Sequence, residues 1–187
     1  MRNARRFRPT TFGSGQIVSV IEVGFPARFL RRGFWLYVWE VNPGPGQELV
    51  YYVGRTGDSS SPNAQSPFVR MGQHLGSSDN SNMLKKHILS TTGLKPDCCH
   101  SFRLLAHGPI LREATNMKRH VPRRNRMAAL ECALAEDLRE AGYNVANDVR
   151  CRHEVDDSLR AEVRRAFSKS LARLRRQLPH PRRCAQF

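Results

Sequence analysis

Two runs of aromatic and β-branched residues on either side of a turn-forming segment constrain the fold of this chain more than any other feature. Residues 34–39 read FWLYVW and residues 49–53 read LVYYV, a composition that suits the pleated, half-buried surface of a strand. Between the runs, residues 42–46 read NPGPG, and proline and glycine favour turns. The sequence therefore predicts a β-hairpin with a longer loop.

A helix start follows the hairpin. Ser66 is suited to be the N-cap, and Pro67 suits the first helical position, where a missing N–H costs nothing. A helix from there places Arg70 and His74 four residues apart on one face. The predicted hairpin, which carries tyrosines, is thus followed at once by a helix that offers a guanidinium and an imidazole on a single side.

The rest of the chain supplies further elements. A short helix is expected at about residues 83–90, a third strand at 101–110 and a helix at 126–141, which Gly142 ends. This last helix has an apolar stripe formed by Met127, Leu130, Leu134 and Leu138. Residues 118–126 are interpreted as an exposed basic connection, residues 155–178 as one amphipathic helix, and residues 16–25 as a short additional strand.

These elements predict an α/β (α+β) fold, with a small, mainly antiparallel three-stranded sheet flanked by helices. We expect a basic N-terminal arm over residues 1–32, a central domain over residues 33–148, and a basic C-terminal helix and tail over residues 149–187. No run approaches ~18 consecutive apolar residues, and the arginine-rich N-terminus lacks the apolar stretch of a secretory signal. A cytoplasmic protein without a membrane partner is therefore expected.

The net charge of +15 indicates a polyanionic partner. Residues 1–32 hold seven arginines against one glutamate, and residues 150–187 hold eleven basic against four acidic residues, whereas the centre is nearly balanced. Arginine, which outnumbers lysine here, forms bidentate contacts with phosphate. Nucleic acid is the favoured partner, and solubility or a polyanionic membrane surface is the alternative explanation of the charge. The five cysteines are odd in number and irregularly spaced, which favours reduced thiols.

The hairpin and the helix after it resemble the GIY-YIG nuclease domain. Tyr37 stands where the first motif has its tyrosine, although Trp35-Leu36-Tyr37 replaces Gly-Ile-Tyr, and Tyr52-Val53-Gly54 matches the second motif, with Thr56 following as in many members. Arg70 and His74 match the arginine and histidine of the family's next helix. The resemblance covers roughly residues 33–148.

The resemblance implies the remaining site residues. Glu131 matches the glutamate that anchors the divalent metal, Mg²⁺ or Mn²⁺, with Glu136 as the fallback, and Asn144 matches the family's asparagine, with Asn147 as a second candidate. Arg70 would neutralise charge on the scissile phosphate. A tyrosine, either Tyr37 or Tyr52, would orient or deprotonate the water with help from His74; a phenol of pKa ~10 needs such help at neutral pH.

The activity implied is metal-dependent endonucleolytic cleavage of DNA, most similar to small stand-alone type II restriction enzymes. Double-stranded DNA is the expected substrate, and a palindromic site would imply a homodimer or sequential nicking. The rivals are a non-catalytic nucleic-acid-binding module that keeps the fold, and an RNA-associated basic protein. The basic residues expected to contact nucleic acid are Arg55, Arg123, Arg124, Arg126, Arg164, Arg165, Arg175 and Arg176.

Overall fold

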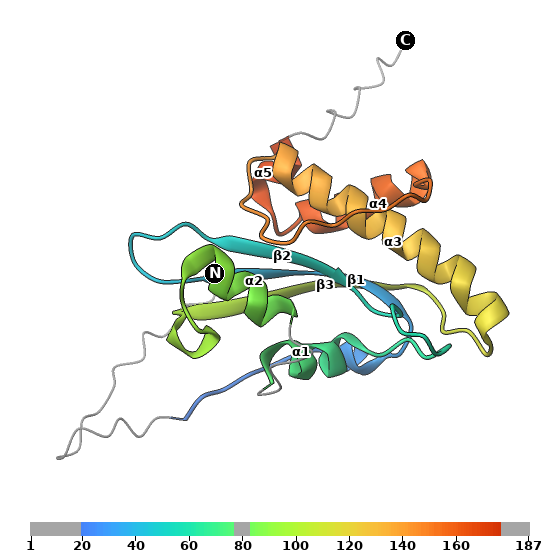
Figure 1. Cartoon of the computed structure of the whole chain (residues 1–187), viewed down its shortest axis with the longest axis horizontal. Helices are drawn as coiled ribbons and strands as arrows, with labels where there is room; N and C mark the ends of the chain where they lie inside the picture. Colours follow the sequence, from blue (N-terminus) through green and yellow to red (C-terminus); the bar gives the residue numbers. More distant parts are fainter. Residues whose placement is uncertain (1–19, 77–82, 177–187) are drawn as a thin grey trace, which may run out of the picture.

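The computed structural model describes residues 20–76 and 83–176. Its centre is a three-stranded antiparallel sheet in the order β2-β1-β3. Helices α1 and α2 lie on one side of this sheet, and α3, α4 and α5 on the other (Figure 1). The predicted mixed α/β class is therefore confirmed. The elements in chain order are η1 (Ala27–Leu30), β1 (Phe34–Asn42), β2 (Val50–Arg55), α1 (Pro67–Leu75), α2 (Met83–Thr92), η2 (Pro96–Cys98), β3 (Ser101–Leu111), α3 (Met117–Glu140), α4 (Asp157–Ser168) and α5 (Ala172–Arg176).

Strand β1 is the middle strand, and its side chains are buried on both faces of the sheet. This burial explains why its sequence is almost continuously apolar rather than alternating. Tyr37 pairs with Gly54 of β2 on one side and with Ala106 of β3 on the other. The predicted hairpin and the predicted third strand are both confirmed.

The alternation of β1 side chains decides which core each residue enters. Leu36 and Val38 point to the side where α3, α4 and α5 complete the larger core. Tyr37 and Trp39 point to the opposite side, where they pack with Leu84 and other side chains of a second core. The strand tyrosine is thus directed toward the face that α1 and α2 cover.

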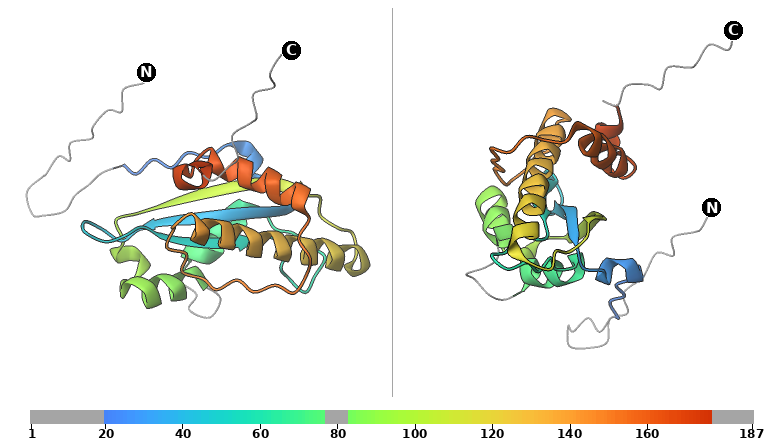
Figure 2. Two further views of the ribbon diagram at one scale, coloured as in Figure 1. Left: turned by 90° about the horizontal axis from the view of Figure 1, so that it is seen from above. Right: turned by 90° about the vertical axis from the view of Figure 1, so that its right-hand side faces the viewer.

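Helix α3 is longer than the sequence predicts, because it begins at Met117 rather than near residue 126 (Figure 2). The Asn116 side chain caps it by accepting a hydrogen bond from Arg119 N at 3.0 Å. The helix continues through Pro122, although this residue supplies no N–H. His120 anchors the first half by burying its ring against Phe34, with 5.2 Å between the ring centroids. Residues 118–126 are therefore helix and not an exposed connection.

The predicted single C-terminal helix is instead two helices, α4 and α5, with a break over residues 169–171. Arg175 donates from Nε and Nη2 to the carbonyls of Ser168 and Lys169, at 3.2 and 3.0 Å, and so satisfies acceptors at the end of α4. Phe167 and Leu174 belong to the same core as α3. Residues 177 and 178 of the predicted helix lie outside the described residues.

The predicted N-terminal strand is not formed by its described part. Residues 20–25 have no regular secondary structure, and residues 16–19 lie outside the described residues. Val20 and Ile21 are 86% and 84% exposed, so they bury no apolar surface that would fix a strand. Within residues 20–76 and 83–176, no helix has the length and apolar character needed to cross a membrane.

Candidate active site

Helix α1 brings Arg70 and His74 to the sheet. Val69 N donates to the Ser66 hydroxyl at 3.4 Å, and Pro67 occupies the first helical position, as predicted. His74, one turn after Arg70, is buried with its Nε2 2.7 Å from the Tyr37 hydroxyl oxygen. A hydrogen bond thus joins a tyrosine of β1 to a histidine of α1, 37 residues later.

Gly54 makes room for the tyrosine of this pair. The Tyr37 ring crosses the backbone of β2 so closely that a Cβ on Gly54 would lie 2.4–2.5 Å from Cε2, Cζ and Oη of Tyr37. Real Cβ atoms do not approach other atoms so closely. The glycine that closes the second motif is therefore a packing requirement of the Tyr37–His74 contact.

Tyr52 lies beside the same histidine. Its ring centroid is 5.4 Å from that of His74 and 5.6 Å from that of His87 on α2. His87 is not among the site residues predicted from the sequence, although its place between the apolar Leu84 and Ile88 indicates a side chain near the core. Tyr52 is 9% exposed and Tyr37 only 2%, so Tyr52 is the more accessible phenol.

Glu131 approaches from α3. Its Oε2 lies 3.2 Å from Nη1 of Arg55 on β2, and the glutamate side chain is 15% exposed. Burial raises the pKa of Glu131 to about 7, and the nearby Arg55 charge opposes that rise. The fallback candidate Glu136 is exposed on the same helix. Arg55, expected from the sequence to contact nucleic acid, is thus the ion-pair partner of the candidate metal ligand.

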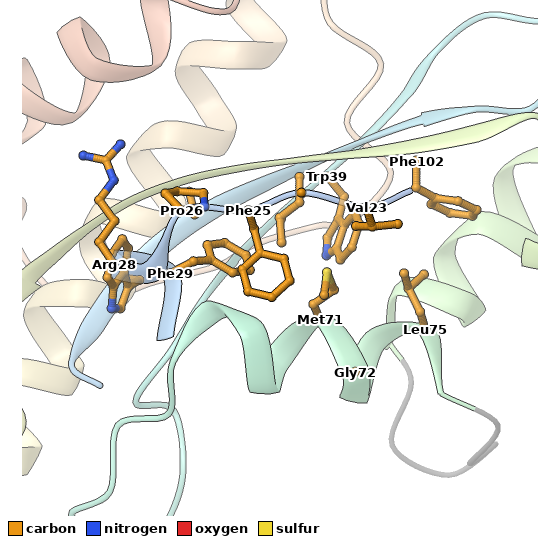
Figure 3. A pocket seen from close by; sticks show the side chains of 14 residues that line it. Val23, Phe25, Pro26, Arg28, Phe29, Trp39, Met71, Gly72, Leu75 and Phe102 are labelled. Carbon is orange, nitrogen blue, oxygen red and sulfur yellow. The ribbon is translucent and has the colours of Figure 1, made fainter. Parts of the chain in front are cut away.

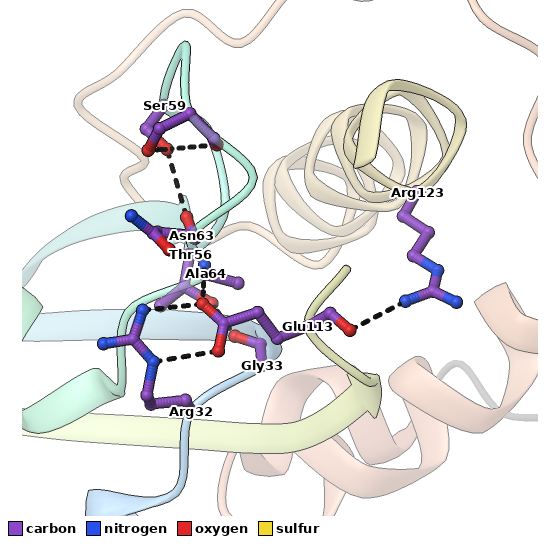
Figure 4. Close-up of polar contacts among 9 residues, drawn as sticks. Arg32, Gly33, Thr56, Ser59, Asn63, Ala64, Glu113 and Arg123 are labelled. Carbon is purple, nitrogen blue, oxygen red and sulfur yellow. Dashed lines mark hydrogen bonds and ion pairs between the residues drawn. The ribbon is translucent and has the colours of Figure 1, made fainter. Parts of the chain in front are cut away.

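The loop between β2 and α1 is anchored at both ends (Figure 4). At its start, Thr56 accepts from Trp35 N at 2.8 Å and donates to Gly33 O at 2.7 Å. At its end, Ala64 N donates to Glu113 at 2.7 Å. Glu113 also receives a two-point ion pair from Arg32, with distances of 2.6 and 2.9 Å.

Burial controls the protonation of the central residues. It lowers the pKa of His74 to about 4, and the Arg70 charge lowers that pKa further, so the imidazole is neutral at pH 7. Burial also raises the pKa of the Tyr37 phenol well above its usual value, against the opposing effect of Arg70. Burial, and then the charge of Glu131, raise the pKa of Tyr52 to about 12. Both phenols therefore carry their protons at neutral pH.

Of the two candidate asparagines, Asn147 is the one whose side chain enters the fold. Its Nδ2 donates to Val53 O at 2.7 Å, and its Oδ1 accepts from Val53 N at 2.9 Å, so it substitutes for a paired strand along β2. This contact extends a parallel bridge between Tyr51 and Val145. Asn144 contributes its backbone carbonyl, which accepts from Tyr51 N at 2.8 Å.

Several arginines expected to contact nucleic acid are engaged within the protein. Arg123 donates to the carbonyls of residues 112 and 113, and Arg126 pairs with Asp156. Arg164 lies 3.4 Å from the buried Asp137. Arg165 is exposed on α4, Arg124 is half-buried on α3, and Arg176 is the last residue of α5. Arg164 thus helps to hold α4 against α3.

The donor set at Glu131 fits a metal held by one protein carboxylate. Among the described residues, no group of three or more histidine, cysteine, aspartate or glutamate side chains is arranged to hold an ion. Magnesium, however, often keeps several waters and binds through one or two carboxylates plus substrate phosphate. The Glu131 side chain is 15% exposed and forms an ion pair with Arg55, and it offers the single carboxylate that such an ion requires.

An apolar hollow lies elsewhere on the face of the sheet that α1 covers. This apolar pocket of about 660 Å³ is bounded by Phe25, Trp39 and Phe102, and from α1 by Met71 and Leu75 rather than by Arg70 and His74 (Figure 3). No carboxylate or imidazole is found among the described residues that line it. Among the described residues, the candidate acid–base groups on this face of the sheet therefore belong to the cluster around Tyr37 and His74 rather than to this pocket.

Comparison of the chain with protein-family models, curated proteins and solved structures finds no significant match. The proposed function therefore rests on the arrangement of the site.

Proposed function

We propose that this protein is a metal-dependent endonuclease of the GIY-YIG type, which hydrolyses phosphodiester bonds of DNA. The observation that carries the proposal is the 2.7 Å contact between Tyr37 and His74, placed beside Arg70 and within electrostatic reach of Glu131. These four residues come from β1, α1 and α3. Phosphodiester hydrolysis needs an activated water, neutralisation of phosphate charge and stabilisation of the leaving oxygen, and these four side chains can supply them.

The Tyr37–His74 pair is suited to moving a proton. In this proposal the Tyr37 oxygen takes a proton from the attacking water while its own proton passes to Nε2 of His74. The two atoms are at hydrogen-bond distance, and His74 is neutral at pH 7, so Nε2 can accept that proton in the tautomer that carries its hydrogen on Nδ1. Because the pKa of His74 is lowered to about 4, it would hold the proton only transiently. The buried phenol therefore needs no free phenolate state, which its raised pKa disfavours.

The other residues of the site bind the phosphate, the water and the metal. Arg70 holds the scissile phosphate, because a guanidinium fork matches phosphate oxygens. Tyr52, whose pKa responds to the Glu131 charge, borders the carboxylate and orients the water or the phosphate. Glu131 would hold a Mg²⁺ or Mn²⁺ ion, which would supply Lewis-acid stabilisation of the leaving oxygen.

Double-stranded DNA is the proposed substrate, since the net charge of +15 favours a polyanion. A restriction-type role, with a homodimer on a palindromic site, extends the same proposal. The alternative is a binding module that retains the fold without cutting. The Tyr37–His74 pair favours the enzyme, because a protein that only binds needs no buried proton-transfer pair.

The test is cleavage of supercoiled plasmid in Mg²⁺ or Mn²⁺ and in EDTA, with Glu131→Gln and the matched control Glu136→Gln. Glu136 is exposed on the same helix. Metal-dependent nicking or discrete fragments, lost in Glu131→Gln and kept in Glu136→Gln, are expected. DNA binding without cutting by the wild type would leave the binding module as the function, and a preference for structured RNA without cutting would favour an RNA-associated protein.

A further inference from the structure

The loop between β2 and α1 carries a carboxylate that the family resemblance assigns to no role. Asp58 Oδ2 accepts from Nη2 of Arg70 at 2.7 Å. The same aspartate lies close enough to influence the ionisation of Tyr52, His74 and Glu131. Asp58 is therefore within the candidate site, although it is not among the site residues that the sequence predicts.

The loop holds Asp58 in a fixed place. The preceding Gly57 has φ +79°, and a Cβ there would lie 2.4 Å from the Phe34 ring. The following Ser59 donates to carbonyls within the loop, at 3.0 Å to Ser61 and 3.1 Å to Asn63. Together with the anchors at Thr56 and Ala64, these contacts fix the backbone on both sides of the aspartate.

Arg70 is held at two of its three nitrogens. Nη2 donates to Asp58, and Nη1 donates to Gln73 Oε1 at 3.1 Å. An arginine side chain has several rotatable bonds, so a guanidinium held from both sides loses less freedom when it engages a phosphate. Tyr37 is a further hydrogen-bonding neighbour of Arg70. The guanidinium has five N–H hydrogens in all, so it retains donors for a ligand.

We propose that Asp58 is a positioning residue, which fixes the Arg70 guanidinium in the orientation that receives the scissile phosphate. This inference rests on the proposed function of the Arg70 site. It assigns Asp58 no contact with the substrate and no proton transfer. In this proposal Asp58 affects cleavage through its hydrogen bond to Arg70.

Two substitutions distinguish this positioning role from a catalytic or metal-binding role. In Asp58→Asn the amide oxygen still accepts from Nη2, whereas Asp58→Ala removes the acceptor. The kcat for a DNA duplex in Mg²⁺ is expected to fall by about 10- to 100-fold in Asp58→Ala and to stay within about threefold of wild type in Asp58→Asn. The control Asp148→Ala breaks an ion pair of the same 2.7 Å length, to Arg150, that is largely exposed, and it should leave kcat unchanged.

Other outcomes would overturn the inference. Equal loss in Asp58→Asn and Asp58→Ala would make Asp58 a catalytic or metal-binding carboxylate. A gain of activity in both variants would mean that Asp58 occupies the place of the phosphate and blocks Arg70. Wild-type kcat in Asp58→Ala would leave Asp58 without a role.

A second measurement does not depend on cleavage. In NMR spectra of the wild type, the ion pair should slow rotation of the Arg70 guanidinium and separate its Nη–H resonances. These resonances should merge in Asp58→Ala and stay separate in Asp58→Asn. Separate resonances in Asp58→Ala would overturn the inference. A wild type that cuts no DNA would instead refute the proposed function, and the NMR comparison would still decide the role of Asp58.

Discussion

The Gly54→Ala substitution tests the arrangement at the centre of the site. The new methyl group would lie 2.4–2.5 Å from three atoms of the Tyr37 ring, whereas ordinary contacts begin at 3.4 Å. The ring must therefore retreat by about 1 Å. A movement of that size disrupts the 2.7 Å contact between the Tyr37 hydroxyl and His74 Nε2, and breaks it if the ring moves away from His74.

Two costs follow from this displacement. Overpacking of a buried site costs about 1–3 kcal/mol, and loss of the buried hydrogen bond adds about 1 kcal/mol. Because Tm falls by about 2–4 °C per kcal/mol in a protein of this size, a thermal melt followed by circular dichroism should show a clear decrease. Cleavage of plasmid DNA should fall by about 100-fold, because the proton acceptor is displaced.

Gly72→Ala is the matched control. Gly72 lies in α1, and a Cβ there would meet nothing within 4 Å. The same methyl group should stabilise the protein by up to about 1 kcal/mol, because alanine favours helix over glycine. If the Gly54→Ala protein has the Tm and the cleavage activity of the wild type, the Tyr37 ring does not pack against Gly54. The proposed Tyr37–His74 geometry is then wrong.

Two further predictions concern Asn147 and Glu131. Asn147→Ala should lower the free energy of unfolding by about 2–4 kcal/mol in urea denaturation, because Val53 loses partners at both its N–H and its C=O. Asn144→Ala keeps the backbone bond to Tyr51 and should change this free energy far less. Equal effects of the two substitutions would contradict the role given to the Asn147 side chain. In EDTA, Glu131 should make stability fall as pH rises from about 4.5 to about 7, because the folded protein retains a proton on it that the unfolded chain releases. Glu131→Gln should remove this part of the pH dependence in melts taken across that window, and an unchanged slope would contradict the raised pKa.

Local signals made part of this fold predictable. The hairpin follows from aromatic and β-branched runs around a proline- and glycine-rich turn, and α1 follows from the Ser66 cap and Pro67. Each of these signals acts within a few residues of the element it specifies. The sequence does not predict the first half of α3, because a run of basic residues is typical of an exposed connection. The Asn116 cap and the burial of His120 stabilise a helix there instead.

The partners within the site depend on contacts between distant parts of the chain. The sequence indicates which side chains could bind phosphate, transfer protons or hold a metal: Tyr37, Arg70, His74 and Glu131. It does not indicate that Arg55 pairs with Glu131 or that Asp58 pairs with Arg70. The choice of Asn147 over Asn144 follows from a contact with Val53 that spans 94 residues. The sequence by itself determined the strands, the capped helix and the basic character of the chain, because these follow from local propensity and composition. Only the tertiary structure decided which charges neutralise one another and which side chains are buried, because both depend on how the sheet and helices pack together.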